Sequence, residues 1–329
     1  MPVENRNQGS WYTNTDCVDV QALMEHLGTV VPTKVLRRHL TKREIAEALR
    51  CTVITRPARG VYALPLDDAA RAAATRLNGT VVLLSAAVHW GFAVQWSAKL
   101  PQVAVPKGRT VAATRRKGID VRWRDIPDID RVGWVTSRVR TVLDCAVLLP
   151  FAEALAVADS ALRSGKVTRE ELEARVAELP RQHRGRVATV IRHADARAAN
   201  PFESVLRAIA LDVPGLRVVP QVRLGDADGF IGTVDLHDGS LGIVLEAESL
   251  EFHGDRYAFD KDCERYTRLA CDGALVLRFT WTQVMHNPDW VRGKLQAAVA
   301  LRTAQRASRG ATRSGATRHT ACLCGARAS

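Results

Sequence analysis

The spacing of apolar residues predicts a small helical domain at residues 18–66. "VDVQALMEHLG" and "TKVLRRHL" carry apolar residues at helical spacing. "TKREIAEALR" opens with Thr41 and Glu44, the pair that forms a capping box at a helix start. Two short strands, 53–56 and 60–64, follow on either side of a Pro-Ala-Arg turn. The order of three helices and a ribbon is typical of a winged helix.

The next segment, residues 67–197, mixes strand-like and helical periods and predicts an α+β middle domain of unclear role. "GTVVLLSAAVHWGFAV", "PQVAVPKGR" and "GIDVRWRDI" contain strand-like runs, whereas "TSRVRTVLDCAVLLP" and "FAEALAVADSALRSG" read as helices. Thr168 and Glu171 form a second capping box. His89, Arg140 and Asp144 fall in this segment, and we expect them to fix helix packing rather than to catalyse a reaction.

Residues 198–301 give the clearest pattern. A helix with Pro201 at its first position precedes three strand-like runs, "LRVVPQVRL", "FIGTVDL" and "LGIVLEAES". The helical "AFDKDCERYTRLACDG", the buried strand "ALVLRFTW" and a last helix complete the order α-β-β-β-α-β-α. Residues 302–329 combine arginine with small residues and little apolar bulk, so we predict a disordered basic tail. The overall fold class expected is α/β.

Composition excludes two broad classes of protein. The chain has 329 residues, of which 47% are hydrophobic, enough for several cores. No apolar run approaches the length of a transmembrane helix, and the N-terminus lacks the apolar region of a signal peptide. Seven scattered cysteines do not suggest a disulfide framework or a zinc site. We therefore expect a cytoplasmic protein with no membrane partner.

The net charge of +12 is unevenly distributed. Residues 1–197 carry +11, residues 198–301 carry −5 and residues 302–329 carry +6. A polyanion such as DNA would be attracted to the two basic blocks. Within the first block, five cations lie on the last predicted helix and on the wing, where winged helices meet DNA: Lys42, Arg43, Arg50, Arg56 and Arg59. The alternative is that these side chains are simply solvated.

Motifs in residues 18–160 resemble the AbiEi-type antitoxins. "TRPARGVYAL" is similar to the R-x-x-R-G-V-Y-x-L wing of that family, and "LSAAVHWGF", "VAVPKGR" and "TSRVRTVLDCA" are similar to the stretches that follow it. The pair His89–Trp90 replaces the usual leucine-histidine type of pair. The resemblance implies a DNA-binding module, and with it a toxin as a further partner.

The run "GIVLEAESLEFHG" places acidic residues at the end of a strand that begins as a buried one. Buried carboxylates are costly, so either the strand emerges into water here or the acids meet a cation. A hairpin centred near residues 240–241 would set Asp235 opposite Glu246, whereas a tight turn at 238–239 would separate them. In the first register Asp235, Glu246 and the carbonyl of Ala247 offer oxygen ligands to Mg²⁺ or Mn²⁺.

The D…ExE spacing on an α-β-β-β-α-β chain resembles the PD-(D/E)XK nucleases, a restriction-endonuclease-like fold. More narrowly, residues 200–300 resemble domain-of-unknown-function family 559, related to the very-short-patch repair endonucleases. The resemblance implies that Asp235 and Glu246 bind the metal, that His253 of "EFHG" takes part in catalysis, and that Glu203 of "NPFES" steers a metal-bound water. Glu248 stands where the family pattern has lysine, and it could ligate a second metal or take a proton.

Because Glu248 stands where the family pattern has lysine, the residue that would bring a positive charge to the site is left open. Lys261 or Arg256 could reach the site, and Arg265 could form a local ion pair with Asp262 three residues earlier. The function expected is that of a Mg²⁺-dependent DNA endonuclease in defence or repair, joined to a DNA-binding module. The alternative is an antitoxin-like transcriptional regulator whose nuclease fold is inactive. An RNA nuclease is a third reading, since a basic surface does not distinguish the two sugars.

Overall fold

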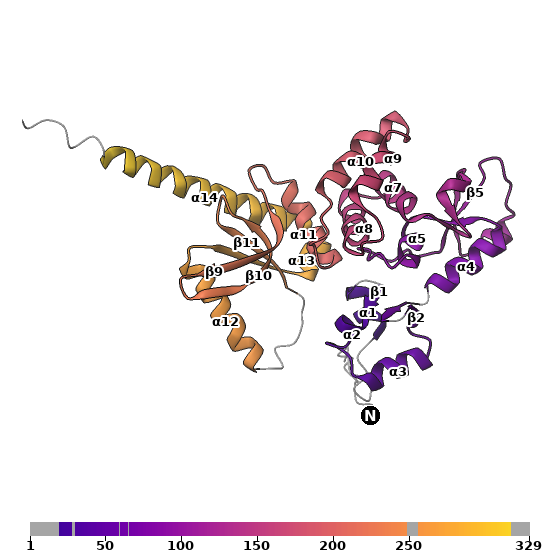
Figure 1. Ribbon diagram of the computed structural model, residues 1–329, viewed down its shortest axis with the longest axis horizontal. Coiled ribbons are helices and arrows are strands. Elements are labelled where there is room, and N and C mark those ends of the chain that lie inside the picture. The colour runs from indigo at the N-terminus through magenta and orange to yellow at the C-terminus, as the bar shows by residue number, and fades with distance from the viewer. Residues whose placement is uncertain (1–19, 28–29, 59, 65, 249–255, 317–329) are drawn as a thin grey trace, which may run out of the picture. The chain divides into compact units, whose positions relative to one another are not determined.

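The computed structural model describes residues 20–27, 30–58, 60–64, 66–248 and 256–316, and it is mixed α/β (Figure 1). The chain divides into two compact units, residues 1–145 and 146–329. The division falls inside helix α7 (Arg138–Leu148), whereas the sequence pattern suggested a boundary at residue 197. The helices between these points therefore belong to the second unit.

The first unit begins with a small helical part. Its elements are α1 (Val20–Leu27), β1 (Val30–Pro32), α2 (Thr33–Leu36), α3 (Lys42–Arg50), β2 (Thr55–Ala58) and β3 (Val61–Ala63). The strands pair in the order β1-β3-β2, and strand β1 was not predicted. The capping box at the start of α3 is confirmed, because Thr41 and Glu44 each accept the other's backbone N–H. Ile45 and Ala48 bury one face of α3, which leaves its other faces exposed.

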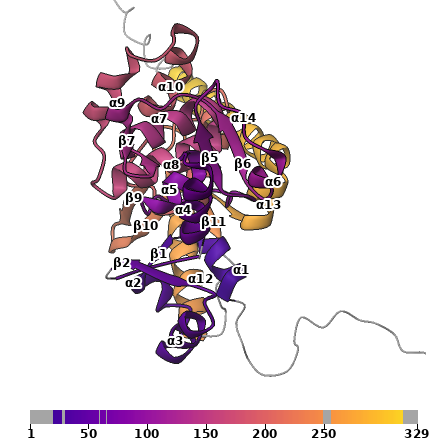
Figure 2. The same cartoon turned by 90° about the vertical axis from the view of Figure 1, so that its right-hand side faces the viewer.

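The rest of the first unit surrounds a sheet of order β6-β5-β4-β8-β7. Its elements are α4 (Leu66–Leu77), β4 (Thr80–Val81), α5 (Leu83–His89), β5 (Gln102–Val105), α6 (Ala113–Arg116), β6 (Asp120–Trp123), η1 (Asp128–Asp130), β7 (Arg131–Val132) and β8 (Val135–Thr136). Helices α4 and α5 pack on β5 (Figure 2). Arg140 forms ion pairs with the buried Asp130 (2.6 Å) and Asp144 (2.8 Å), which is the packing role expected of Arg140 and Asp144.

The second unit opens with three helices and continues with the predicted α-β-β-β-α-β order. Its elements are α8 (Phe151–Arg163), α9 (Arg169–Val176), α10 (Arg181–His193), α11 (Pro201–Leu211), β9 (Val219–Asp226), β10 (Gly229–Asp238), β11 (Ile243–Glu248), α12 (Arg256–Cys271), β12 (Leu275–Thr280), α13 (Trp281–His286) and α14 (Pro288–Ala316). The order was predicted correctly, apart from the short α13. The capping box of Thr168 and Glu171 on α9 is also confirmed.

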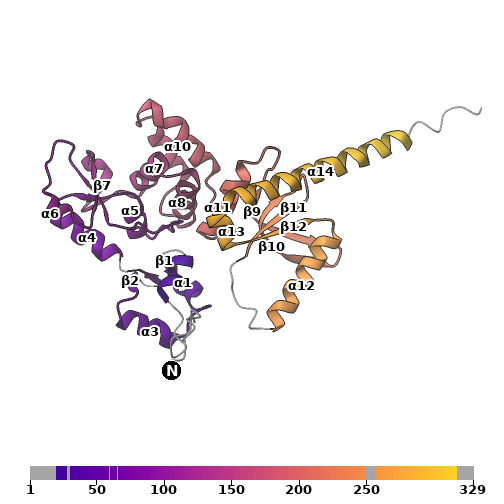
Figure 3. The same ribbon diagram turned by 180° about the vertical axis from the view of Figure 1, so that it is seen from behind.

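A sheet of order β12-β11-β10-β9 forms the middle layer of the second unit. Strand β10 runs antiparallel to both β9 and β11, whereas β11 and β12 run parallel. One face packs against α11, α13 and α14 through residues such as Phe202, Leu245 and Val291. The other face packs against α12 through Val244 and Leu269 (Figures 1 and 3). The acidic residues lie where β10 and β11 run side by side.

The register of β10 and β11 follows the first of the two predicted hairpins. Leu236 pairs with Leu245 and Asp238 with Ile243, so Asp235 and Glu246 are the next pair along the strands. The fully buried carboxylate of Asp238 selects this turn. It accepts the backbone N–H groups of residues 217, 240 and 241 at 2.6–2.9 Å and the hydroxyl of Ser240 at 2.7 Å. A tight turn at 238–239 would break these bonds.

The prediction that disorder begins at residue 302 is wrong, because α14 continues to Ala316 (Figure 3). Alanine, arginine and glutamine are strong helix formers. In addition, Arg302 donates to the carbonyls of Gly242 and Gly273, and Arg306 donates to that of Ser240, which ties the helix to the turns beside it. Residues 317–329 lie outside the described part of the chain. No helix in that described part is long and apolar enough to cross a membrane.

Candidate functional site

Two carboxyl groups, the half-buried Asp235 on β10 and the buried Glu246 on β11, lie opposite each other where these strands pair. Asp235 and Glu246 are neighbours across the strand pair, and Asp235 Oδ2 accepts the N–H of Ala247 at 2.8 Å. Burial and the neighbouring charge of Asp235 raise the pKa of Glu246 to about 8, and burial raises the pKa of Asp235. At neutral pH the pair therefore retains a proton or requires a cation beside it.

Gln221, which was not predicted as a site residue, joins Asp235 to a third acid, Glu203. Its amide Nε2 donates to Glu203 Oε2 at 2.9 Å and to Asp235 Oδ1 at 3.2 Å. The register of β9 and β10 sets Gln221 opposite Asp235, and its φ of +53° distorts the strand at this point. The one available signal was a polar residue between Pro220 and Val222 in an otherwise apolar run.

Glu203 occupies the third position of α11, where the helix start holds it in place. Its own N–H donates to the side chain of Asn200 (2.9 Å), and its carboxylate accepts from the N–H of Ala199 (2.8 Å) and from the amide of Asn200 (2.9 Å). Burial and the charge of Asp235 raise its pKa to about 7. The structure therefore links the predicted Glu203 to Asp235 through the side-chain amide of Gln221.

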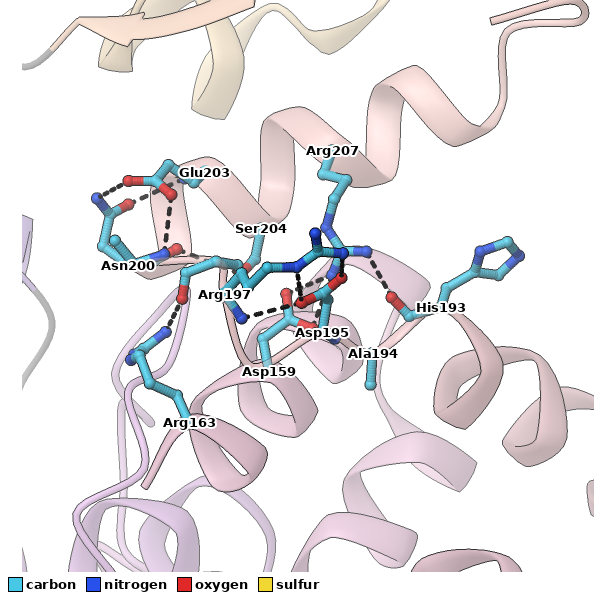
Figure 4. A network of polar contacts seen from close by, with 12 residues as sticks. Asp159, Arg163, His193, Ala194, Asp195, Arg197, Asn200, Glu203, Ser204 and Arg207 are labelled. Atoms are coloured by element: carbon cyan, nitrogen blue, oxygen red, sulfur yellow. Dashed lines mark hydrogen bonds and ion pairs between the residues drawn. The ribbon is translucent and has the colours of Figure 1, made fainter. Parts of the chain in front are cut away.

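A polar network beneath α11 anchors the segment that leads to Glu203 (Figure 4). Arg207 makes two bonds of 2.7 and 2.6 Å to Asp159 on α8, and both side chains are buried. Asp159 also accepts the N–H of Asp195 at 2.7 Å, and Arg163 donates to the carbonyl of Ala198. The chain that runs into the cap of α11 is thus held to α8 at both of its ends.

Glu248, the residue in the expected lysine position, is already engaged. Its Oε1 accepts the phenol of Tyr266 at 2.6 Å and Nε of Arg278 at 2.8 Å. Burial opposes ionisation, but these two hydrogen bonds hold the pKa of Glu248 below its ordinary value. Glu248 is therefore an ionised partner of Arg278. This environment does not suit the role of proton acceptor that was considered for Glu248 from the sequence.

Arg265 on α12 places a positive charge against Glu246. Its guanidinium forms an ion pair with Glu246, rather than the local pair with Asp262 that its spacing suggested. Of the two cations considered from the sequence, the side chain of Lys261 is exposed and that of Arg256 lies outside the described residues, as does all of His253. Sequence spacing missed Arg265 because the contact depends on how α12 packs across the sheet.

The carboxylate oxygens of Asp235 and Glu246 are suitable ligands for a hard divalent cation, but they supply only part of a coordination shell. Both carboxyl groups have raised pKa values, which means that their surroundings do not fully offset two negative charges. Mg²⁺ commonly takes one or two carboxylates together with water and phosphate. Within the described ranges no group of three or more His, Cys, Asp or Glu side chains could hold a metal ion. A cation would therefore depend on these two carboxylates and on backbone, water or substrate oxygens.

The predicted DNA-contacting cations lie in different settings. Lys42 and Arg43 are exposed in the first turn of α3, whereas Arg50 at its end pairs with Glu47. Arg56 is exposed on β2, with its guanidinium 5.9 Å from the ring of Tyr62. The remaining predicted residue, Arg59, lies outside the described part of the chain.

Comparisons with known proteins find similar proteins whose names state no activity. No family model matches the chain. The uncharacterized proteins MT2308 and Rv2248, from two strains of Mycobacterium tuberculosis, are each 30% identical to it over 171 residues, which is 50% of this chain. The chain covers about 60% of the length of these curated relatives. The crystal structure of the RV2827C protein from the same species matches with a TM-score of 0.31 and 14% identity, over 56% of this chain and 78% of that one.

Proposed function

We propose that this protein is a divalent-metal-dependent nuclease that hydrolyses phosphodiester bonds in DNA. The observation that carries the proposal is the contact between Asp235 and Glu246 across β10 and β11, with the pKa of Glu246 raised to about 8. Two neighbouring carboxyl groups that are largely withdrawn from water accommodate a proton or a cation between them. Their place on a sheet of the order α-β-β-β-α-β agrees with the resemblance to PD-(D/E)XK nucleases.

Each residue of the site has a distinct part in this proposal. Asp235 and Glu246 would hold Mg²⁺ or Mn²⁺ with the carbonyl of Ala247, and the bound cation would activate water and offset charge on the phosphate. Glu203, whose pKa is raised to about 7, is suited to accept a proton on its carboxylate near neutral pH. Gln221 orients Glu203 and Asp235 by donating to both.

DNA contact is assigned to the basic N-terminal part, because residues 198–301 carry a net charge of −5. The exposed Lys42 and Arg43 on α3 and Arg56 on β2 are the described candidates for phosphate contacts. This part would act as the AbiEi-like winged-helix module. In this proposal the protein works in the cytoplasm.

Calorimetry with Mn²⁺ and Mg²⁺, combined with plasmid nicking on the same samples, tests the nuclease proposal. Asp235→Asn and Glu246→Gln should each abolish metal binding and nicking. Asp226→Asn is a matched control, since Asp226 lies on the same sheet but pairs with Arg268 instead. Wild-type protein that binds neither metal and cuts neither DNA nor RNA would refute the proposal, and cleavage of RNA alone would change the substrate.

One observation favours a second candidate, an antitoxin-like DNA-binding regulator with an inactive nuclease fold. The guanidinium groups of Arg265 and Arg278 already pair with Glu246 and Glu248, so the acids have partners without a metal. A protein of this kind would bind its own promoter, and a cognate toxin would be its partner. Binding in a band-shift assay without metal binding or cleavage would favour this candidate.

A further inference from the structure

We propose that Arg265 is the exchangeable cation of the site: it pairs with Glu246 when no metal is bound, and binds a substrate phosphate once a metal is bound. This inference rests on the proposed nuclease function. It assigns to α12 the positive charge that PD-(D/E)XK nucleases carry as lysine on the strand.

The charges around Glu246 support an exchange. One guanidinium faces two carboxyl groups in the described structure, since Arg265 pairs with Glu246 and Asp235 lies opposite Glu246 on the neighbouring strand. A divalent cation held by both carboxylates would balance their two charges alone. The charge of Arg265 would then be unbalanced and repelled by the metal at short range. A phosphate oxygen of the substrate is the anion that restores the balance, and guanidinium is suited to bind it.

The guanidinium of Arg265 also has an unused donor. Its terminal nitrogen donates to Glu246, but Nε is buried and has no hydrogen-bond partner among the described residues. Buried donors in folded proteins nearly always have a partner. In this position the guanidinium therefore has an unsatisfied donor, and the two non-bridging oxygens of a phosphodiester could accept two of its N–H groups at once.

The residues around Arg265 leave space for the aliphatic part of its side chain. A Cβ on Gly232 of β10 would lie 3.2 Å from Cδ and 3.5 Å from Nε of Arg265, so the absence of a side chain there makes room for the stem. The ring of Tyr266 lies 5.0 Å from the guanidinium carbon. The side chain of Arg265 is 25% exposed, against 6% for Glu246, so part of the Arg265 side chain borders solvent while its partner is buried.

Arg278 is the other arginine near the acids, but its contacts differ. Its Nε donates to Glu248 at 2.8 Å, and its guanidinium carbon lies 4.2 Å from the centre of the Tyr266 ring. Its partner Glu248 is outside the Asp235–Glu246 pair. A metal at that pair would therefore compete with Arg265 before it competed with Arg278.

The test measures Mg²⁺ binding by calorimetry at about pH 9, where proton competition is weak, and plasmid nicking on the same samples. Arg265→Gln should bind Mg²⁺ roughly tenfold more tightly, a typical size for coupled binding, because a competing cation is gone. The same variant should nick roughly 100-fold or more slowly, the loss expected when one stabilising donor is removed from a reaction centre. A residue that only stabilised the fold would not move these two quantities in opposite directions.

Two further variants keep the result decisive. Arg268→Gln is the control, because Arg268 lies one turn along α12, is equally exposed and pairs with Asp226. It should leave both quantities unchanged. Gly232→Ala retains every charge but crowds the stem of Arg265, so it should also tighten Mg²⁺ binding and slow nicking. Circular dichroism establishes that each variant is folded.

Every outcome decides the question. Weaker Mg²⁺ binding in Arg265→Gln, or nicking equal to that of Arg268→Gln, would overturn the exchange. Wild type that binds no Mg²⁺ beside an Arg265→Gln variant that does would refute the proposed function while supporting the competition between Arg265 and the metal. If neither protein bound Mg²⁺ while both were folded, both proposals would be refuted.

Discussion

Replacing Arg207 by methionine should destabilise the second unit more than any surface change. Arg207 makes two hydrogen bonds of 2.6 and 2.7 Å to Asp159, and the two side chains are 4% and 0% exposed. Methionine fills much of the same volume but leaves the Asp159 carboxylate buried without its counter-ion. Removing one partner of such a pair costs about 3–5 kcal/mol. A neighbouring surface pair, Arg197 with Asp195, is 55% and 22% exposed and should contribute less than about 1 kcal/mol.

Hydrogen exchange followed by mass spectrometry reports this loss for the second unit alone. Peptides covering α8 and α11 should exchange roughly 100- to 4,000-fold faster in Arg207→Met, since each 1.4 kcal/mol is about tenfold. The same change loosens the segment before Asn200, so calorimetry should also find weaker Mn²⁺ binding. Arg197→Met serves as the control and should change exchange in these peptides by less than about fivefold.

The double variant Asp159→Leu with Arg207→Met separates charge from packing. Replacing both members of a buried pair by apolar residues is often neutral or stabilising, so the double variant should recover much of the protection lost in the single one. Equal losses in Arg207→Met and Arg197→Met would refute the reasoning, because burial would then not determine the cost. A double variant less stable than Arg207→Met would show that Asp159 acts through its other hydrogen bond, to the N–H of Asp195.

Three further predictions follow from individual contacts. Because the folded-state pKa of Glu246 is about 8, above its ordinary 4.5, the folded metal-free protein holds an extra proton between these values; its stability should fall as pH rises towards 8, and Glu246→Gln should flatten that slope in urea titrations. Asp238→Ala leaves several turn N–H groups unpaired and should cost at least about 2 kcal/mol by urea unfolding, with weaker metal binding. Lys42→Ala with Arg43→Ala should lower the salt slope of DNA binding by about 2, whereas Arg50→Ala, which breaks a pair with Glu47, should leave it nearly unchanged.

Local sequence signals predicted the elements well because their causes are local. The capping boxes at Thr41 and Thr168 formed as expected, since each depends on residues three positions apart. The order of helices and strands along residues 198–301 followed from runs of apolar residues bounded by turns. The hairpin register stayed open because the acceptor role of Asp238 was not recognised: it binds groups of residues 240 and 241 in the turn and the N–H of residue 217, which is far away in sequence.

The site itself was predicted only in part. Asp235, Glu246 and Glu203 come together as their spacing and the resemblance suggested, but Gln221 and Arg265 enter the site through packing of separate elements. A helix period indicates which face of α12 is buried, but not which strand residue each side chain reaches. The α14 helix shows the same limit, since its arginines bind carbonyls of turns that the sequence does not place nearby.

The cost of the buried acids bears on the choice between the two candidate functions. A regulator that used this fold only as a scaffold would gain nothing from carboxyl groups whose pKa values are raised to about 7 and about 8. Each such shift lowers stability at neutral pH, and apolar replacements of buried ionic groups are often neutral or stabilising. A cation bound beside Glu203 and Glu246 would restore the stability that these shifts remove. Arg265 offsets this cost only partly, because one guanidinium serves two carboxyl groups. This imbalance favours the nuclease over the inactive scaffold.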